Sequence, residues 1–266
     1  MASNPPAAND DDQPTVDAGS IDNPVALVTG ASRGIGFATA KALGSTGWHV
    51  VAVARTVGGL EELDDAIKQA GGSATLVPMD LADHEGIDRL GLALYQRFGR
   101  VDALVGNAGI LGTVTPVAHL KPKVFDEVFN INVTSNFRLL RSIDPLLRQS
   151  PNPRAVFLTS GLARMDKPFF GTYAASKAAL EALVRTYASE NANSAIRCNL
   201  FNPGPVRTAL RARAVPGEKP DTLPAPEQIV EAILELCSPQ WNQTGMVYDL
   251  PSKQIRPAAL AGSPAG

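Results

Sequence analysis

Short runs of apolar, mainly β-branched residues alternate along the chain with longer stretches in which apolar residues recur every three or four positions. The short runs predict strands at 25–29, 49–54, 74–79, 102–106, 154–160, 195–201 and 245–250. The longer stretches predict amphipathic helices at 36–45, 60–70, 84–98, 122–149, 172–190 and 226–238. Continuous apolar strands separated by crossover helices form parallel sheets covered on both faces. The pattern therefore predicts one doubly wound α/β domain with a seven-stranded parallel sheet and ligands beyond the carboxyl ends of its strands.

The two ends of the chain do not share this pattern. Residues 1–23 are rich in Pro, Ala, Asn and Asp, and residues 251–266 also carry few large apolar side chains. Ordering such segments costs conformational entropy with little burial in return. We therefore expect flexible tails at 1–23 and 251–266 and a folded domain over 24–250.

Composition narrows the class of function. The formal net charge of −2 and the scattered basic residues argue against nucleic acid as a partner. No apolar run reaches the ~20 residues that span a bilayer, and the N-terminus lacks the features of a secretory signal, so we expect a soluble, cytoplasmic protein with no membrane partner. The two cysteines, Cys198 and Cys237, and the three histidines lack disulfide or metal-ligand spacing, so no metal site is expected.

The segment VALVTGASRGIGFATAKAL (25–43) places Gly30, Gly34 and Gly36 between a buried strand and an amphipathic helix. Glycines there allow a tight turn and let the backbone approach a pyrophosphate, and the helix N-terminus adds free N–H groups. The alternative is a turn that merely needs small residues. With a strand before it and a helix after it, the turn favours the dinucleotide site of a Rossmann-type domain.

The end of the second strand indicates which dinucleotide binds. An acidic residue about 20 positions after the glycines would bind a ribose 2′-hydroxyl, but here the strand ends in Ala54 and Arg55. A guanidinium at that point, with Arg33 in the glycine turn as a second one, suits a 2′-phosphate. Each arginine alone could be an ordinary surface residue. Together they favour NADP(H) over NAD(H).

Tyr173 and Lys177 are four residues apart on a predicted helix, so their side chains share a face. A phenol has an ordinary pKa of ~10, and a neighbouring ammonium favours the phenolate, which makes the phenol a usable acid or base. An isolated pair of this kind would more often be a core tyrosine beside a surface lysine. Ser160, however, ends a strand at the predicted ligand edge and can donate to a substrate carbonyl oxygen.

These features occur in an order that resembles the short-chain dehydrogenase/reductase superfamily. The resemblance covers residues 25–250 and rests on TGASRGIG at 29–36, Asp80 in MDLAD, NAG at 107–109, Asn132 in FNINVTSNF, Ser160, YAASK at 173–177 and NPGPVRT at 202–208. It implies an enzyme in which a nicotinamide cofactor supplies hydride. The protein then needs to supply only position, a donor that polarises the carbonyl and a proton.

The resemblance implies a role for each catalytic residue. Tyr173 would donate the proton in reduction and accept it in oxidation, and Lys177 would lower the pKa of Tyr173 and bind the nicotinamide ribose. Ser160 would hold and polarise the carbonyl. Asn132 would place a water in a proton relay from Lys177 to solvent.

Further positions would bind the cofactor. Asp80, with Leu81 beside it, would accept from the adenine amino group, residues 107–109 would line the adenine ribose, and residues 203–208 would enclose the nicotinamide end. The complete set of expected cofactor-binding residues is Gly30, Ser32, Arg33, Gly34, Ile35, Gly36, Arg55, Asp80, Leu81, Asn107, Ala108, Gly109, Tyr173, Lys177, Pro203, Gly204, Val206 and Thr208.

Two features depart from the family pattern. Gly106 stands where many relatives have the first Asn of NNAG, and we expect a looser end of the fourth strand, with an effect on stability before function. The last strand continues as TGMVYDLPSKQ without the usual glycine pair, which would alter the rim of the substrate pocket and a nearby subunit contact. Relatives often pair through two long helices, here 122–149 and 172–190, so a homodimer or homotetramer is expected.

The substrate pocket has two expected borders. Residues 207–226 would cap it, and one of Phe169 and Phe170 would form part of its wall. The basic residues of the cap (Arg207, Arg211, Arg213 and Lys219) hint at an acidic or acyl-carrier-bound substrate, although a solvated helix face is the better explanation of them.

The sequence thus predicts an NADPH-dependent carbonyl reductase, or an alcohol dehydrogenase in reverse, acting on a small-molecule carbonyl or alcohol. One alternative is a 3-oxoacyl thioester reductase of the same chemistry. Another is a regulatory protein that binds NADP(H) without turnover. The regulatory protein would have no reason to retain Asn132, Ser160, Tyr173 and Lys177 together.

Overall fold

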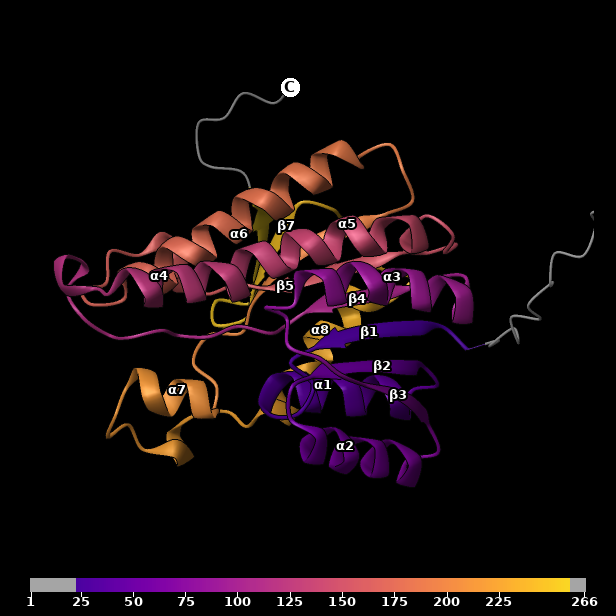
Figure 1. Cartoon of the computed structure of the whole chain (residues 1–266), viewed down its shortest axis with the longest axis horizontal. Helices are drawn as coiled ribbons and strands as arrows, with labels where there is room; N and C mark the ends of the chain where they lie inside the picture. Colours follow the sequence, from indigo (N-terminus) through magenta and orange to yellow (C-terminus); the bar gives the residue numbers. More distant parts are fainter. Residues whose placement is uncertain (1–22, 259–266) are drawn as a thin grey trace, which may run out of the picture.

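The computed structural model describes residues 23–258, so most of the tail expected at 1–23 and the second half of that expected at 251–266 lie outside the described residues. Over this range one sheet runs in the order β3-β2-β1-β4-β5-β6-β7-β8 (Figure 1). The strands are β1 (Val25–Thr29), β2 (His49–Ala54), β3 (Ser73–Pro78), β4 (Ala103–Gly106), β5 (Arg154–Leu158), β6 (Arg197–Asn202), β7 (Met246–Asp249) and β8 (Gln254–Pro257). The first seven are parallel, and the strand order reverses between β1 and β4, where such sheets bind ligands.

Helices cover both faces of the sheet, which confirms the predicted α/β architecture of Rossmann type. The helices are α1 (Gly34–Ser45), α2 (Val57–Gln69), α3 (His84–Phe98), α4 (Pro122–Phe129), α5 (Ser135–Leu147), α6 (Gly171–Glu190), α7 (Ala209–Ala214) and α8 (Val230–Cys237). Helices α3, α5 and α6 lie on one face, and α1, α2 and α8 on the other (Figure 1). No helix within residues 23–258 is both long enough and apolar enough to cross a bilayer.

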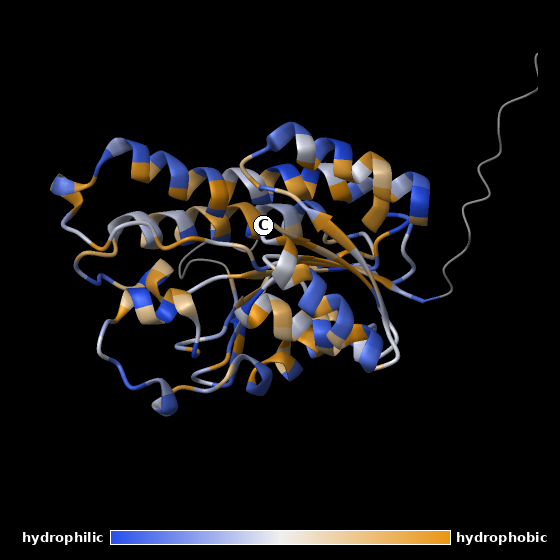
Figure 2. Cartoon of the chain, turned by 60° about the horizontal axis from the view of Figure 1, so that its bottom comes forward, coloured by the Kyte–Doolittle hydropathy of each residue, from blue (hydrophilic) through white to orange (hydrophobic). Residues whose placement is uncertain are grey.

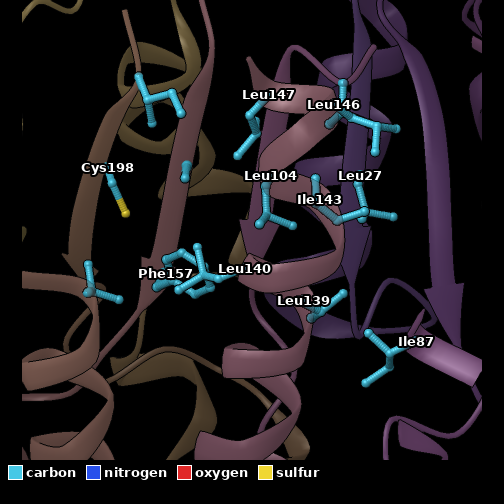
Figure 3. Packing of buried hydrophobic residues seen from close by; sticks show 14 of the residues in the cluster. Leu27, Ile87, Leu104, Leu139, Leu140, Ile143, Leu146, Leu147, Phe157 and Cys198 are labelled. Carbon is cyan, nitrogen blue, oxygen red and sulfur yellow. The ribbon is translucent and has the colours of Figure 1, made fainter. Parts of the chain in front are cut away.

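The core consists of two apolar layers, one on each face of the sheet. Successive strand residues face opposite layers, so Leu27 packs with α3, α5 and α6, whereas Val28 packs with α1, α2 and α8. In the first layer, Leu104 lies next to Ile143 of α5, and Phe157 from the neighbouring strand lies next to Leu140 of the same helix (Figure 3). Apolar residues follow the strands and the inner helix faces, while the outer helix faces are hydrophilic (Figure 2). Alternation of short apolar runs with amphipathic helices thus produces the three-layered fold.

The sheet differs from the prediction at its C-terminal edge. An eighth strand, β8, pairs antiparallel with β7, with Val247 opposite Arg256, so the predicted count of seven is one short and the added strand lies inside the expected tail 251–266. Its segment QIRP has no apolar run and is largely exposed. Backbone hydrogen bonding to an edge, rather than burial, places this strand, and hydrophobic periodicity does not reveal such a strand.

The single helix predicted over 122–149 is also interrupted. Residues Asn130–Thr134 form a π-helical turn between α4 and α5. The main-chain oxygen of Asn132 accepts a hydrogen bond from Asn136 Nδ2 at 2.8 Å. Such π turns add one residue to a helical turn and occur frequently at functional sites, and here the turn carries Asn132.

Candidate active site

A cavity of about 1060 Å³ opens at the carboxyl ends of the parallel strands. All the predicted site residues line it except Gly36 and Asn132, which pack behind its wall. The structure therefore brings together residues that are up to 178 positions apart, from Gly30 to Thr208. This placement follows from the topology, because every parallel strand ends at the same edge of the sheet.

The glycine turn fits a dinucleotide. Gly30 has a φ of +66°, which favours glycine, and a Cβ at Gly36 would lie 2.3 Å from the Gly30 oxygen. Helix α1 begins at Gly34 without a side-chain cap, so its first N–H groups are free to bind phosphate. Asn107 Nδ2 donates to the Thr29 oxygen at 2.8 Å, so this side chain holds the turn itself.

Arg55, which is expected to select the cofactor, forms an ion pair with Asp80, which is expected to bind the adenine amino group. Arg55 Nη1 lies 3.6 Å from Asp80 Oδ2, and the Arg55 side chain is 62% exposed. An exposed ion pair of this kind contributes little to stability, so a bound phosphate can compete for the guanidinium. The strand end itself carries no acid, as predicted, but Asp80 from the next strand end is a neighbour that the sequence reading did not place there.

Tyr173 is half-buried on α6 and is hydrogen-bonded to Ser160, which follows β5. Burial raises the pKa of Tyr173 to about 12, and the hydrogen bond to Ser160 opposes this rise. The sequence predicts that Lys177 lowers this pKa. In the structure, Ser160 is the group that lowers it.

Lys177 lies one helical turn after Tyr173, and its Nζ is 5.8 Å from the centre of the Tyr173 ring. Its ammonium donates to the Leu158 oxygen at 2.7 Å. Burial lowers the pKa of Lys177 to about 8, and the carboxylate of Glu181 counteracts this shift. Lys177 is therefore a buried cation that is close to its titration point near neutral pH.

Asn132 is fully buried in the π turn, with its side chain committed to neighbouring groups. Its Oδ1 accepts from the Ile110 N–H at 2.8 Å, and its Nδ2 donates to the Ile110 oxygen and to Ser176 Oγ, each at 2.9 Å. A Cβ at Gly109 would lie 3.3 Å from Asn132 Oδ1 and 3.5 Å from Lys177 Nζ. The amide therefore fixes the wall next to Lys177.

The two departures from the family pattern have structural counterparts. A Cβ at Gly106 would lie 2.2 Å from Phe157 Cδ1, so Phe157 fills the space and the expected loosening of β4 is absent. At the C-terminal edge, Asp249 and Pro251 line the cavity, and Pro251 packs against Gly204. The segment after β7 thus forms part of the rim.

The expected cap lies over the cavity. Helix α7 stands apart from the helical layers (Figure 1), and residues from 207 to 214 line the cavity. Arg211 is bound in a bidentate ion pair by Glu218, with both distances 2.6 Å. Phe170 lines the cavity, which confirms that one phenylalanine of the pair forms its wall, whereas Phe169 is exposed.

Three residues near the site were missed by the sequence reading. Asn202 Oδ1 accepts from the N–H groups of Gly161 and Gly204, and an ion pair joins the buried carboxylate of Glu181 to the partly exposed Arg164. Glu181 follows Lys177 at the same four-residue interval that separates Lys177 from Tyr173. That interval was the available signal for Glu181. Asn202 begins the NPGPVRT motif, which was the available signal for it, and nothing in the local sequence marks Arg164.

A parallel sheet with a glycine-rich phosphate turn at its switch point, and with Ser160, Tyr173 and the buried Lys177 beside it, defines a nicotinamide-dependent oxidoreductase. Residues 24–219 match the family described as short chain dehydrogenase. The chain belongs to this family and is an NAD(P)-dependent enzyme.

The relatives and solved structures agree with this membership. The chain is 32% identical over 233 residues to uncharacterized oxidoreductase YciK of Escherichia coli (strain K12), covering 86% of this chain and 92% of that one. It is 34% identical over 187 residues to a 3-oxoacyl-[acyl-carrier-protein] reductase of a Synechocystis species, covering 70% and 75%. A short chain dehydrogenase from Shigella flexneri complexed with NADP has a TM-score of 0.82 and 34% identity, covering 86% of this chain and 97% of that one.

Proposed function

We propose that this enzyme uses NADPH to reduce a small carbonyl compound to a secondary alcohol, with Tyr173 as the proton donor. The observation that carries the proposal is the convergence of Ser160, Tyr173 and Lys177 in one cavity with the dinucleotide turn. The hydrogen bond between Ser160 and Tyr173 places two hydroxyl groups side by side. One carbonyl oxygen can accept from both. When bound, the cofactor supplies the hydride.

The protonation states of Tyr173 and Lys177 suit reduction of a carbonyl group. Burial keeps the phenol of Tyr173 protonated at neutral pH, so it can donate to the carbonyl oxygen. The ammonium of Lys177 then stabilises the phenolate that remains. Because Lys177 Nζ also donates to the Leu158 oxygen, it is fixed in place. The proton relay expected through Asn132 stays a prediction, because its side-chain amide is already hydrogen-bonded to Ile110 and Ser176.

The cofactor would lie along the strand ends, with its pyrophosphate at the turn before α1 and its nicotinamide near Tyr173. We propose that Arg33 and Arg55 bind a 2′-phosphate and so select NADPH. Both guanidinium groups line the cavity, and the ion pair of Arg55 with Asp80 is long and exposed. The NADP named for the Shigella structure supports the same choice.

An Arg55→Asp variant tests the cofactor selection. We expect the ratio of kcat/KM for NADPH to that for NADH to fall by roughly tenfold or more, because a charge-assisted hydrogen bond is lost and a like charge faces the phosphate. The matched control is Arg89→Asp, which makes the same charge change at an exposed arginine outside the cavity. An unchanged ratio in Arg55→Asp would remove Arg55 from cofactor selection.

A second candidate substrate is a 3-oxoacyl thioester on a phosphopantetheine arm. The observation that favours it is a pair of cations, Arg213 in the cap and Lys167 before α6, which line the cavity without an ion-pair partner among residues 23–258. An anionic phosphate could bind these two cations. A 3-oxoacyl thioester with the phosphopantetheine arm and its truncated analogue without the phosphate separate the candidates. A KM at least several-fold lower for the phosphate-bearing compound would favour the thioester, and equal KM values would favour a small ketone or aldehyde.

A further inference from the structure

The polar face of α6 continues beyond the catalytic pair. Tyr173, Lys177 and Glu181 follow one another at four-residue intervals and so lie on one side of the helix. Glu181 is only 3% exposed. Carboxylates are rarely buried to this extent unless they are paired and hydrogen-bonded.

The partners of Glu181 lie on both sides of Ser160 in the sequence. Thr159 Oγ1 donates to Glu181 Oε1 at 2.8 Å, and Arg164 Nε donates to Oε2 at 2.8 Å. Thr159 directly precedes Ser160, and Arg164 ends the 3-10 turn (Gly161–Arg164) that follows it. One carboxylate therefore fixes both chain segments that hold the Ser160 hydroxyl. Arg164 extends the connection to the residue that follows β8 by donating to the Ala258 oxygen at 2.8 Å.

The carboxylate of Glu181 also interacts electrostatically with Lys177. The titratable and charged groups of the described residues that face Lys177 are Tyr173 and Glu181 on α6 and, beyond Glu181, Arg164. The other elements packed against the ammonium present uncharged groups, namely the Leu158 oxygen from β5 and the Asn132 amide from the π turn. Glu181 is thus the negative charge that raises the pKa of Lys177 against the effect of burial.

We propose that Glu181 is a positioning residue of the reduction, whose buried carboxylate fixes the chain around Ser160 and provides the counter-charge of the Lys177 ammonium. This proposal rests on the function proposed above for Ser160, Tyr173 and Lys177. It gives Glu181 no contact with substrate or cofactor. In this proposal Glu181, which does not line the cavity, keeps Lys177 protonated. Glu181 therefore sets the pH above which the rate of reduction falls.

A titration of Lys177 in the full chain tests the proposal without any need for turnover. In protein labelled with 13C at the lysine ε-carbon, the Lys177 resonance is identified by its loss in Lys177→Arg, and its pKa is expected at about 8. In Glu181→Gln the pKa should fall by about one unit, a tenfold loss of proton affinity. The sign follows from the charge, because the Lys177 ammonium loses the anion that stabilises it and therefore loses its proton at a lower pH.

Two variants that keep the charges serve as controls. Glu181→Asp retains the carboxylate, and Arg164→Lys retains the cation that pairs with it. Each variant should therefore leave the pKa of Lys177 near the wild-type value, even if the protein unfolds more easily. If Glu181 had a purely structural role, the variants would differ in stability, but the pKa of Lys177 would be the same in all of them. An unchanged pKa in Glu181→Gln, or an equal shift in Glu181→Asp, overturns the proposal.

Kinetics give the second readout. Reductase kcat in the wild type should fall as the pH rises through about 8, where Lys177 loses its proton, and in Glu181→Gln this fall should begin about one unit lower. If Glu181→Gln does not fold, the double variant Glu181→Gln with Arg164→Met removes both members of the ion pair together, which proteins tolerate better than removal of one partner. The same shift is expected there, and its absence counts against the proposal. Failure of the proposed function would show separately, as turnover that survives in Tyr173→Phe.

Discussion

Phe157 fills the space that a side chain at position 106 would occupy. A Cβ there would lie 2.2 Å from Phe157 Cδ1 and 2.9 Å from Asn136 Oδ1. The glycine is therefore matched to its neighbours on β5 and α5. The family motif alone indicates that a side chain is missing at position 106, whereas the packing shows that Phe157 occupies its volume.

Restoring the family residue should therefore destabilise this protein. Gly106→Asn is expected to reduce the free energy of unfolding by about 1–3 kcal/mol through overpacking in the core, measured by urea denaturation. The matched control is Gly58→Ala, where an added Cβ has no atom within 4 Å. That control should leave stability unchanged or slightly raise it, since alanine suits a helix better than glycine. Equal unfolding midpoints for Gly106→Asn and the wild type would contradict the packing argument.

Much of the site could be predicted at the level of single residues. Gly30, Ser160, Tyr173 and Lys177 were found because their residue types fit one chemistry and because strand ends and helix spacing place them together. The partners of these residues could not be predicted in the same way. That Asp80 approaches Arg55 depends on how two neighbouring strand ends turn, and no spacing in the sequence encodes this contact.

Among the secondary-structure elements, the sequence predicts the strands and helices whose position is determined by the burial of apolar side chains. Strands β1 to β7 and most helices follow from apolar periodicity, because each buries an apolar stripe. The π turn at 130–134 and strand β8 depend instead on hydrogen bonds, one set around Asn132 and the other along the edge of β7. Periodicity contains no information on such bonds, so these two elements were missed.

The cap that contains α7 is held by an ion pair rather than by apolar packing. The cap helix has no buried residue, and Glu218 binds Arg211 through both carboxylate oxygens. Glu218→Gln should therefore loosen the cap and raise the KM of the carbonyl substrate by roughly threefold to tenfold, with little change in NADPH affinity. Steady-state kinetics and NADPH titration measure the two effects.

The control for this prediction lies in the same segment. Asp221→Asn weakens the longer contact of Arg207 with Asp221, 3.5 Å apart and highly exposed, so its KM should stay close to that of the wild type. If KM rises in both Glu218→Gln and Asp221→Asn, or in neither, the ion pair of Arg211 with Glu218 does not hold the cap.

At the scale of the whole molecule, α4 and α5 present aromatic side chains to solvent. Phe125 stacks on Phe129, with ring centres 4.4 Å apart, and Phe137 on α5 is 46% exposed. Exposed aromatic residues on neighbouring helices are typical of protein interfaces. We propose that this surface (Phe125, Phe129 and Phe137) joins two copies of the chain, which agrees with the dimer or tetramer expected from the resemblance.

Phe137→Asp tests this surface. Sedimentation at micromolar concentration should show a dimer or tetramer for the wild type and a smaller species for the variant, because a carboxylate would be buried without a partner. Val57→Asp is the control, since Val57 is similarly exposed on α2, on the opposite side of the sheet. An equal mass for Phe137→Asp and the wild type would exclude Phe137 from the interface.

The Tyr173 hydroxyl is the proposed proton donor in an NADPH-dependent reduction. The most direct measurement is NADPH consumption by the wild type and by Tyr173→Phe over a panel of ketones, aldehydes, quinones and 3-oxoacyl thioesters, with the Kd for NADPH determined for both proteins. We expect turnover in the wild type, a loss of at least a hundredfold in kcat in the variant and a nearly unchanged Kd, because the ring remains and only the hydroxyl is removed. Equal turnover by both proteins would contradict the assignment of Tyr173 as the acid.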